Sequence, residues 1–346
     1  MSFDPNGVGV ANGNLFGFPA TEEDADLVII PIPWDATASY GKGTSNGPQA
    51  ILDASTQLDF FHPRLNKAYE TQVFLTPISE EWKAINDEFN QRAAVYFSDL
   101  EQLGEAPAQL KHSAIIDEIN AAHSALTGNL KSRVEKLLKS GKICAVLGGE
   151  HSTPLGLIQA LDEHYDAFSI LQIDAHADLR KAYEGFEQSH ASIMYNVVDS
   201  CDTLVQLVQV GIRDLSQDEY ERSLNHPKIT TYFDWDLKEA SFQGKSWKTQ
   251  CEEIIEALST DVYISFDIDG LIPNLCPNTG TPVPGGFTLE QVSYLLFAIV
   301  DSGRSIIGFD LNEVSPGNHG DWDANVGARA LWQLICATEL SRRKSC

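Results

Sequence analysis

Three short segments of the chain are dense in side chains that bind metal ions. They are residues 148–152, 174–178 and 265–270. Together they offer two imidazoles and four carboxylates: His151, His176, Asp174, Asp178, Asp267 and Asp269. Nitrogen and oxygen ligands without a thiolate are typical of Mn²⁺ or another borderline divalent ion, and less so of a structural zinc site.

Six such side chains exceed what one ion needs once water ligands are included. If one or two carboxylates bridge, the set fits two metal ions about 3.5–4 Å apart. The alternating order Asp174-x-His176-x-Asp178 places these side chains on one side of an extended backbone, and Asp267-x-Asp269 does the same. The sequence therefore predicts a binuclear centre.

The elements that must position these ligands are short apolar runs, partly β-branched, as expected of strands buried on both faces. We predict strands at residues 27–32, 143–147, 168–173, 204–210, 262–266 and 306–311. Helical apolar patterns lie at residues 47–58, 115–138, 289–300 and 328–340. This alternation predicts an α/β fold, a mostly parallel sheet with helices on both faces, in a single domain over residues 1–346. Residues 69–111 fit the alternation least well and are predicted to be an insertion or a surface excursion.

Each of the three ligand segments follows or closes a predicted strand. In an open parallel sheet, ligands bind beyond the carboxyl ends of the strands, so segments distant in sequence can converge there. A single His or Asp at a strand end usually caps a loop, but three such segments are hard to obtain by chance. A dinucleotide site is rejected, because no GxGxxG opens a helix after the first strand.

Two further polar residues are candidates for the site. Glu313 follows the last predicted strand and is either a surface acid or an anion facing the metal ions. His190 lies in a predicted loop and, taken alone, is more typical of a surface histidine. Residues 279–286, rich in Pro and Gly, form a rigid, sharply bent loop that could wall a pocket.

Composition excludes several functional classes. The 346-residue chain carries a net charge of −25, so it repels phosphate backbones and we expect no nucleic-acid partner. No stretch approaches the roughly 20 apolar residues of a membrane span. A basic leader is absent and the six cysteines form no CxxC pair, so a cytoplasmic protein with reduced thiols is expected.

These segments together resemble the ureohydrolase family, which includes arginase, agmatinase and formimidoylglutamase. The similarity extends over residues 27–340 and includes residues 40–44 and 47–51 near the start. The resemblance implies a three-layer αβα sandwich around a sheet of about eight strands, and a homotrimer or homohexamer. It also implies two Mn²⁺ per chain, with Ni²⁺ possible, held by the six ligands named above. In the family pattern Asp174 and Asp267 bridge the ions, His190 transfers protons and Glu313 faces the guanidinium group.

The stretch after the second ligand segment indicates which members of the family the chain resembles. Residues 179–185 lack the Asn- and Thr-rich pattern with which arginases hold an α-amino acid, and they resemble bacterial agmatinases. Residues 69–111 and 321–329 instead resemble a divergent agmatinase-like branch in which free guanidine is a substrate. Trp322 or Trp34 could close a smaller pocket there.

The function expected from this resemblance is hydrolysis of a guanidino C–N bond with release of urea. Asp178 would orient the attacking hydroxide, Glu313 would fix the planar cation, and His190 would carry a proton to the departing amine. Agmatine, giving putrescine and urea, is the first candidate substrate. Guanidine, giving urea and ammonia, is the alternative, followed by a guanidino acid and formimidoylglutamate.

Two functions of other classes are less consistent with the sequence. A metal-dependent deacetylase normally uses one zinc ion and a His-His pair, and no His-His occurs here. A non-catalytic scaffold would be favoured by a lost ligand, and none of the six is lost.

Overall fold

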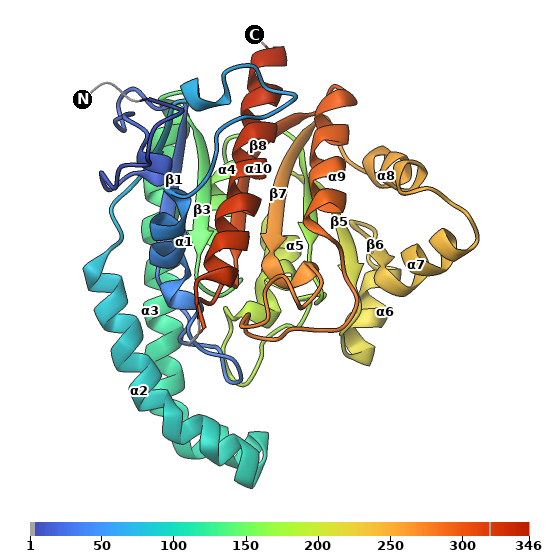
Figure 1. Ribbon diagram of the computed structural model, residues 1–346. Coiled ribbons are helices and arrows are strands. Elements are labelled where there is room, and N and C mark those ends of the chain that lie inside the picture. The colour runs from blue at the N-terminus through green and yellow to red at the C-terminus, as the bar shows by residue number, and fades with distance from the viewer. Residues whose placement is uncertain (1–3, 318–319, 346) are drawn as a thin grey trace.

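A parallel sheet forms the centre of the computed structural model, which describes residues 4–317 and 320–345 (Figure 1). Within these residues the sheet has eight strands in the order β2-β1-β3-β8-β7-β4-β5-β6. Their bounds are β1 Leu27–Ile32, β2 Val73–Leu75, β3 Ile143–Gly148, β4 Phe168–Ile173, β5 Leu204–Ile212, β6 Ile229–Phe233, β7 Asp261–Asp267 and β8 Ser305–Asn312.

Helices cover both faces of this sheet, so the predicted three-layer α/β architecture is confirmed. The helices are α1 Gly47–Ser55, α2 Glu80–Leu103, α3 Glu105–Lys139, α4 Leu155–Asp162, α5 Ile193–Ser200, α6 Gln217–Asn225, α7 Asp234–Phe242, α8 Trp247–Glu256, α9 Leu289–Asp301 and α10 Trp322–Ser345. One apolar core joins the sheet to α1, α8, α9 and α10, and a second joins the opposite face to α2, α3, α4 and α5. Burial of the strands on both faces explains their continuous apolar runs.

All six predicted strands are present, and two strands were missed. Both missed strands, β2 and β6, lie at the edges of the sheet. β2 has only three residues, and the three central residues of β6 are partly exposed. Short or half-exposed edge strands lack the apolar run by which the central strands are recognised.

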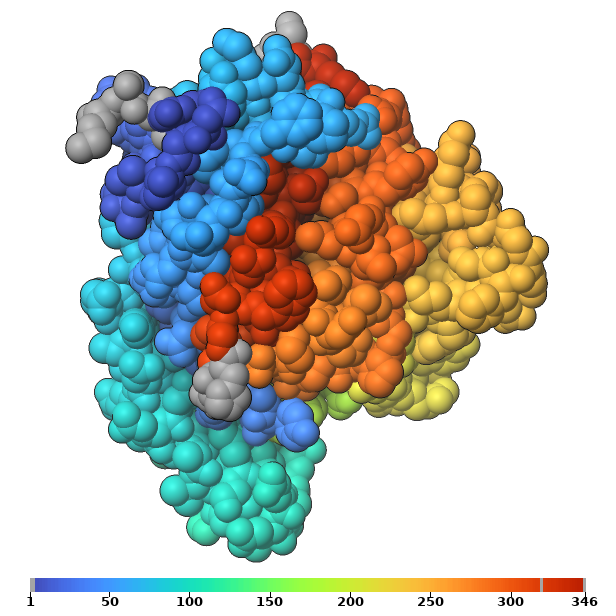
Figure 2. Space-filling model, in the orientation of Figure 1, coloured from blue at the N-terminus to red at the C-terminus, as the bar shows by residue number. Residues whose placement is uncertain are grey.

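Residues 69–111, which were predicted to be an insertion or a surface excursion, contain regular secondary structure. This segment supplies β2, which pairs with β1, and the long helix α2, which Ser79 caps by accepting from the Trp82 N–H. Gly104, with φ of 79°, then turns the chain into α3. The resulting α2–α3 hairpin extends beyond the body of the molecule (Figures 1 and 2). Its polar composition reflects this exposure, because only a narrow stripe of each helix packs on the core.

No helix within the described ranges is both long enough and apolar enough to cross a membrane.

Candidate metal centre and active site

The ligand segments meet because four neighbouring strands, β3, β8, β7 and β4, end at one edge of the sheet. A cavity of about 180 Å³ lies beyond this edge. Its walls include the side chains of His151, His176, Asp178, Asp267, Asp269, His190 and Glu313. The convergence that the sequence predicts for the three segments is therefore present, and Glu313 and His190 line the same cavity.

His151 follows β3 and points one ring nitrogen at three carboxylates. Its Nδ1 lies 3.0 Å from Asp174 Oδ2, 3.1 Å from Asp178 Oδ2 and 3.3 Å from Asp267 Oδ2. This buried nitrogen has no hydrogen-bond partner. The other nitrogen, Nε2, lies 2.8 Å from Ser265 Oγ, so the ring is held from behind as metal-binding imidazoles usually are. An orphaned nitrogen that faces carboxylate oxygens fits a divalent cation between them.

His176 forms a second group of ligands on the other side of Asp174. Its Nδ1 lies 2.9 Å from Asp269 Oδ2 and 3.7 Å from Asp174 Oδ1. The two compact donor sets among the described residues are His151, Asp174 and Asp267, and Asp174, His176 and Asp269. Asp174 belongs to both, which is the arrangement expected of a carboxylate that bridges two ions. Asp178, the sixth predicted ligand, lies outside these two sets but next to His151.

The electrostatics of this cluster favour bound cations. Burial, followed by the charges of Asp269 and Asp174, raises the pKa of Asp267 well above its ordinary value. Burial and the charge of Asp174 raise the pKa of Asp178 to about 7. Burial opposes protonation of His151, yet the adjacent carboxylates of Asp174, Asp178 and Asp267 raise its pKa well above the ordinary value. These carboxylates attract positive charge, which divalent ions supply better than protons.

We predict that the stabilisation given by metal ions grows as the pH rises. Above about pH 6.5, the folded metal-free protein keeps protons on His151, His176 and Asp267, whose pKa values are raised, while the unfolded chain has released them. The metal-free protein therefore loses stability with increasing pH. Burial opposes ionisation of Asp174, yet interactions with His151 and His176 lower its pKa. Its contribution to stability is therefore complete above about pH 4 and changes with pH only in acidic solution.

Thermal unfolding of metal-loaded and chelator-treated protein tests this prediction. The difference in Tm between the two samples should widen by roughly 3 °C or more between about pH 6.5 and 8.5. Comparing the difference at each pH removes the effect of other titrating groups, which both samples share. A difference that narrows with pH would contradict the prediction.

Two acidic residues reach the cavity through left-handed backbone. Asp178 has φ of 53° and Glu313 has φ of 64°, a region that non-glycine residues seldom adopt. The Asp178 carbonyl accepts the N–H groups of Met194 and Tyr195 at 3.1 Å each, which anchors it to α5. The Glu313 N–H donates to Gly149 O at 2.8 Å, and its Oε1 accepts the His151 N–H at 2.8 Å. Strain of this kind is found at functional sites.

His190 begins a short 3₁₀ turn before α5 and borders the cavity. Its Nδ1 lies 3.4 Å from Thr37 Oγ1, and its ring packs edge-on against Tyr183 with centroids 5.6 Å apart. Burial, reinforced by the charges of His176 and His151, lowers the pKa of His190 to about 4. His190 is thus held beside the ligands as a neutral imidazole, and it is not the surface residue that its isolated sequence context favours.

Neither tryptophan that was expected to shorten the pocket does so. Trp34 is fully buried and packs edge-on against Trp82 and Phe89 of α2, because its apolar ring fills the core under the hairpin. Trp322 is 51% exposed at the start of α10, and its indole N–H donates to Asn274 O. The cavity walls contain neither residue, so the prediction of a tryptophan-lined pocket was wrong.

The site also contains residues that the sequence did not single out. Tyr183 lines both the main cavity and a small adjoining space of about 60 Å³, whose walls include residues 38–41. Arg180 stacks on Tyr183 at 4.8 Å and lies 3.4 Å from Glu219 Oε2. The pattern Arg-x-x-Tyr after Asp178 could have pointed to these two side chains. Their position in the site could not be predicted from it, because Arg180 packs against Glu219 of α6.

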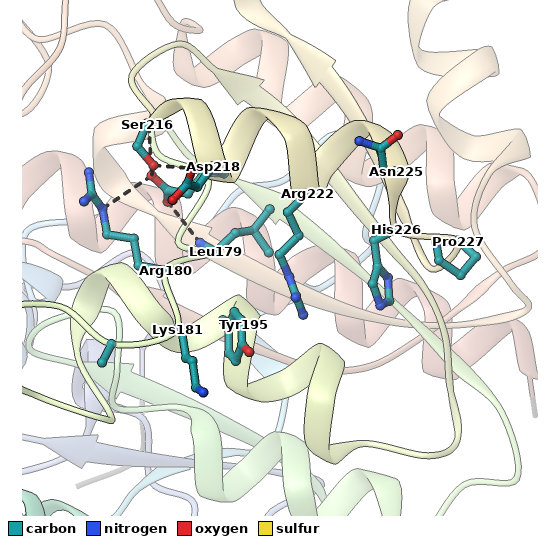
Figure 3. Close-up of a pocket in the computed structure, with 12 residues that line it drawn as sticks. Leu179, Arg180, Lys181, Tyr195, Ser216, Asp218, Arg222, Asn225, His226 and Pro227 are labelled. Carbon is teal, nitrogen blue, oxygen red and sulfur yellow. Dashed lines mark hydrogen bonds and ion pairs between the residues drawn. The ribbon is translucent and has the colours of Figure 1, made fainter.

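A larger surface cleft of about 650 Å³ shares part of its wall with the main cavity (Figure 3). Arg180 and Glu219 line both this cleft and the main cavity. Glu219 caps α6 together with Ser216, and its Oε1 accepts the Leu179 N–H at 3.1 Å. The wall between the two spaces is therefore a fixed structure that holds the backbone directly after Asp178.

Comparison with known proteins agrees with this site and fold. The sequence model described as the Arginase family matches residues 25–337. N(1)-aminopropylagmatine ureohydrolase of Thermus thermophilus is 33% identical over 90% of this chain and 89% of its own length. The agmatinase of Proteus mirabilis is 29% identical over 93% of this chain and 92% of its own. The chain belongs to the arginase family of hydrolases, within its agmatinase-like branch.

A solved structure shows the same fold. The agmatine ureohydrolase of Thermoplasma volcanium superposes with a TM-score of 0.73 over 95% of each chain, at 24% sequence identity.

Proposed function

We propose that the protein hydrolyses agmatine to putrescine and urea at a binuclear metal centre. The observation that carries the proposal is the cluster of two imidazoles and four carboxylates, beside which Glu313 and His190 line the same cavity. The names of the relatives from Proteus mirabilis and Thermoplasma volcanium support agmatine as the substrate. We further propose Mn²⁺ as the metal, with Ni²⁺ as the alternative, and a cytoplasmic homotrimer or homohexamer.

The chemistry requires a strong nucleophile, because the charge of a guanidinium carbon is delocalised over three nitrogens. The six ligands would hold two divalent ions, which would supply this nucleophile by lowering the pKa of a bound water. The second oxygen of Glu313, Oε2, can bind the planar cation, since Oε1 is already occupied by the His151 N–H. Asp178 orients the attacking oxygen, and His190 brings a proton to the departing nitrogen.

The far end of the cavity favours a substrate with a distal cation. Asp214 lines the cavity and is exposed, so its carboxylate is available to an ammonium group. Arg180 is engaged by Glu219 and Tyr183, which reduces its attraction for a carboxylate. The carboxylate of an α-amino acid head would therefore lack a partner, which weakens its binding.

Initial rates across a panel of guanidino compounds test the substrate. We expect kcat/KM for agmatine to exceed that for arginine by roughly 10²-fold or more. The panel also includes free guanidine, a guanidino acid, formimidoylglutamate and N(1)-aminopropylagmatine, each with Mn²⁺ and Ni²⁺ loaded separately. The matched variant is Asp214→Asn, which should raise KM for agmatine and leave guanidine hydrolysis unchanged. Arginine as the best substrate would overturn the proposal.

Free guanidine is the second candidate because of the size of the cavity. The main space is about 180 Å³ and the adjoining space only about 60 Å³, so a small cation is well enclosed. If guanidine has a higher kcat/KM than agmatine, and Asp214→Asn affects neither substrate, the alternative replaces the first proposal.

A further inference from the structure

A chain of buried polar groups connects helix α3 to His190. His123 Nε2 lies 2.9 Å from Ser152 Oγ, and Ser152 Oγ donates to Glu150 Oε1 at 2.6 Å. Thr37 Oγ1 donates to the same carboxylate oxygen at 2.7 Å and lies 3.4 Å from His190 Nδ1. His123, Ser152, Glu150 and Thr37 are all buried. The metal ligands do not account for this chain, since none of its members contributes a ligand atom to either donor set.

Glu150 determines the direction in which these groups donate. Three donors converge on its carboxylate: the Ser152 hydroxyl, the Thr37 hydroxyl and the Thr37 N–H, which lies 3.1 Å from Oε2. With three donors directed at its two oxygens, the Glu150 carboxyl group is the acceptor in each of these hydrogen bonds. Both hydroxyl protons are then directed at Glu150.

The single proton of Thr37 can serve only one partner. Because Thr37 donates to Glu150 at 2.7 Å, its oxygen faces His190 as an acceptor. His190 must then carry its proton on Nδ1, which leaves the lone pair on Nε2. The 3.4 Å separation is long, but hydrogen bonds at active sites often shorten when substrate binds.

We propose that Thr37 is a positioning residue for the reaction: its hydroxyl, oriented by Glu150, holds the Nδ1–H of His190 and makes Nε2 the nitrogen that exchanges a proton. The inference rests on the proposed role of His190 in proton transfer. In this arrangement Nε2 accepts the proton that the attacking water loses and later gives it to the departing nitrogen, while Nδ1–H stays on the ring throughout. Histidines used in this way depend on a fixed tautomer.

Thr37→Val removes the hydroxyl and keeps the shape of the side chain. We expect kcat for urea release to fall about 10–100-fold with KM changed about twofold or less, because only proton transfer is affected. Thr37→Ser keeps the hydroxyl and should retain kcat within about threefold. The matched control is Thr338→Val in α10, which removes another buried hydroxyl, one that forms no hydrogen bond within the described residues.

The decisive measurement combines these changes with His190→Ala. If Thr37 acts through His190, Thr37→Val should have no further effect on kcat in the His190→Ala background. Equal losses in both backgrounds, or failure of Thr37→Ser to restore kcat, would overturn the inference. If Thr37→Val does not fold, Glu150→Gln serves instead, because its amide can donate to Thr37 and reverse the orientation of the Thr37 hydroxyl. Glu150→Gln is also expected to have no further effect on kcat in the His190→Ala background. Its metal content is measured alongside. Full activity of His190→Ala would instead refute the proposed role of His190.

Discussion

His190→Ala is expected to lower kcat by roughly 10²–10⁴-fold while KM changes much less. Collapse of the tetrahedral intermediate needs a proton on the departing nitrogen. His190, a neutral imidazole that borders the cavity, can accept this proton from the attacking water and pass it on. In the proposed mechanism Glu313 binds the guanidinium group, and the substitution leaves Glu313 in place. Steady-state kinetics of urea release with the preferred substrate measure both constants.

A surface histidine provides the control for this substitution. His164 lies just beyond α4 and is exposed, so His164→Ala should leave both constants unchanged. Metal content of His190→Ala must equal that of the unaltered protein, because His190 belongs to neither donor set. Undiminished activity of His190→Ala at every pH would assign His190 a surface role and remove it from the mechanism.

The part of the site that could be predicted from sequence is the part fixed by strand ends. His151, Asp174 and Asp267 each follow or close a central strand, and a parallel sheet brings such positions to one edge whatever the loops do. The same reasoning recovers the central strands, which are buried on both faces and therefore apolar throughout.

The parts that could not be predicted depend on packing between distant segments. Thr37 reaches His190 only because the loop after β1 lies against Glu150, a contact across 113 positions. Trp34 was expected near the pocket, but α2 covers it, and nothing local in the sequence shows that α2 packs there. The left-handed backbone of Asp178 and Glu313 is likewise imposed by contacts with α5 and Gly149 rather than by residue type.

Asp174 and Asp269 differ in a way that allows the two-ion arrangement to be tested. Asp174 contributes to both donor sets, with Oδ2 toward His151 and Oδ1 toward His176, whereas Asp269 contributes to one. Asp174 is also held by Gln172, whose amide donates to Oδ2 at 2.8 Å. A carboxylate placed between two cations neutralises both, so replacing it weakens each site at once.

Asp174→Asn is therefore expected to abolish binding of both ions and to lower urea release by roughly 10³-fold or more, since the nucleophile depends on them. Asp269→Asn should retain about one ion per chain, and the unaltered protein about two. Elemental analysis after saturation and removal of free metal gives these ratios, and Asp202→Asn, at an exposed position, serves as the control. The amide of Asp174→Asn can still accept the His176 N–H that Oδ1 now accepts at 2.6 Å, so the backbone after β4 keeps its anchor. A saturated value near one ion in the unaltered protein, together with full activity of Asp269→Asn, would show that a single ion suffices and that Asp174 binds it without bridging.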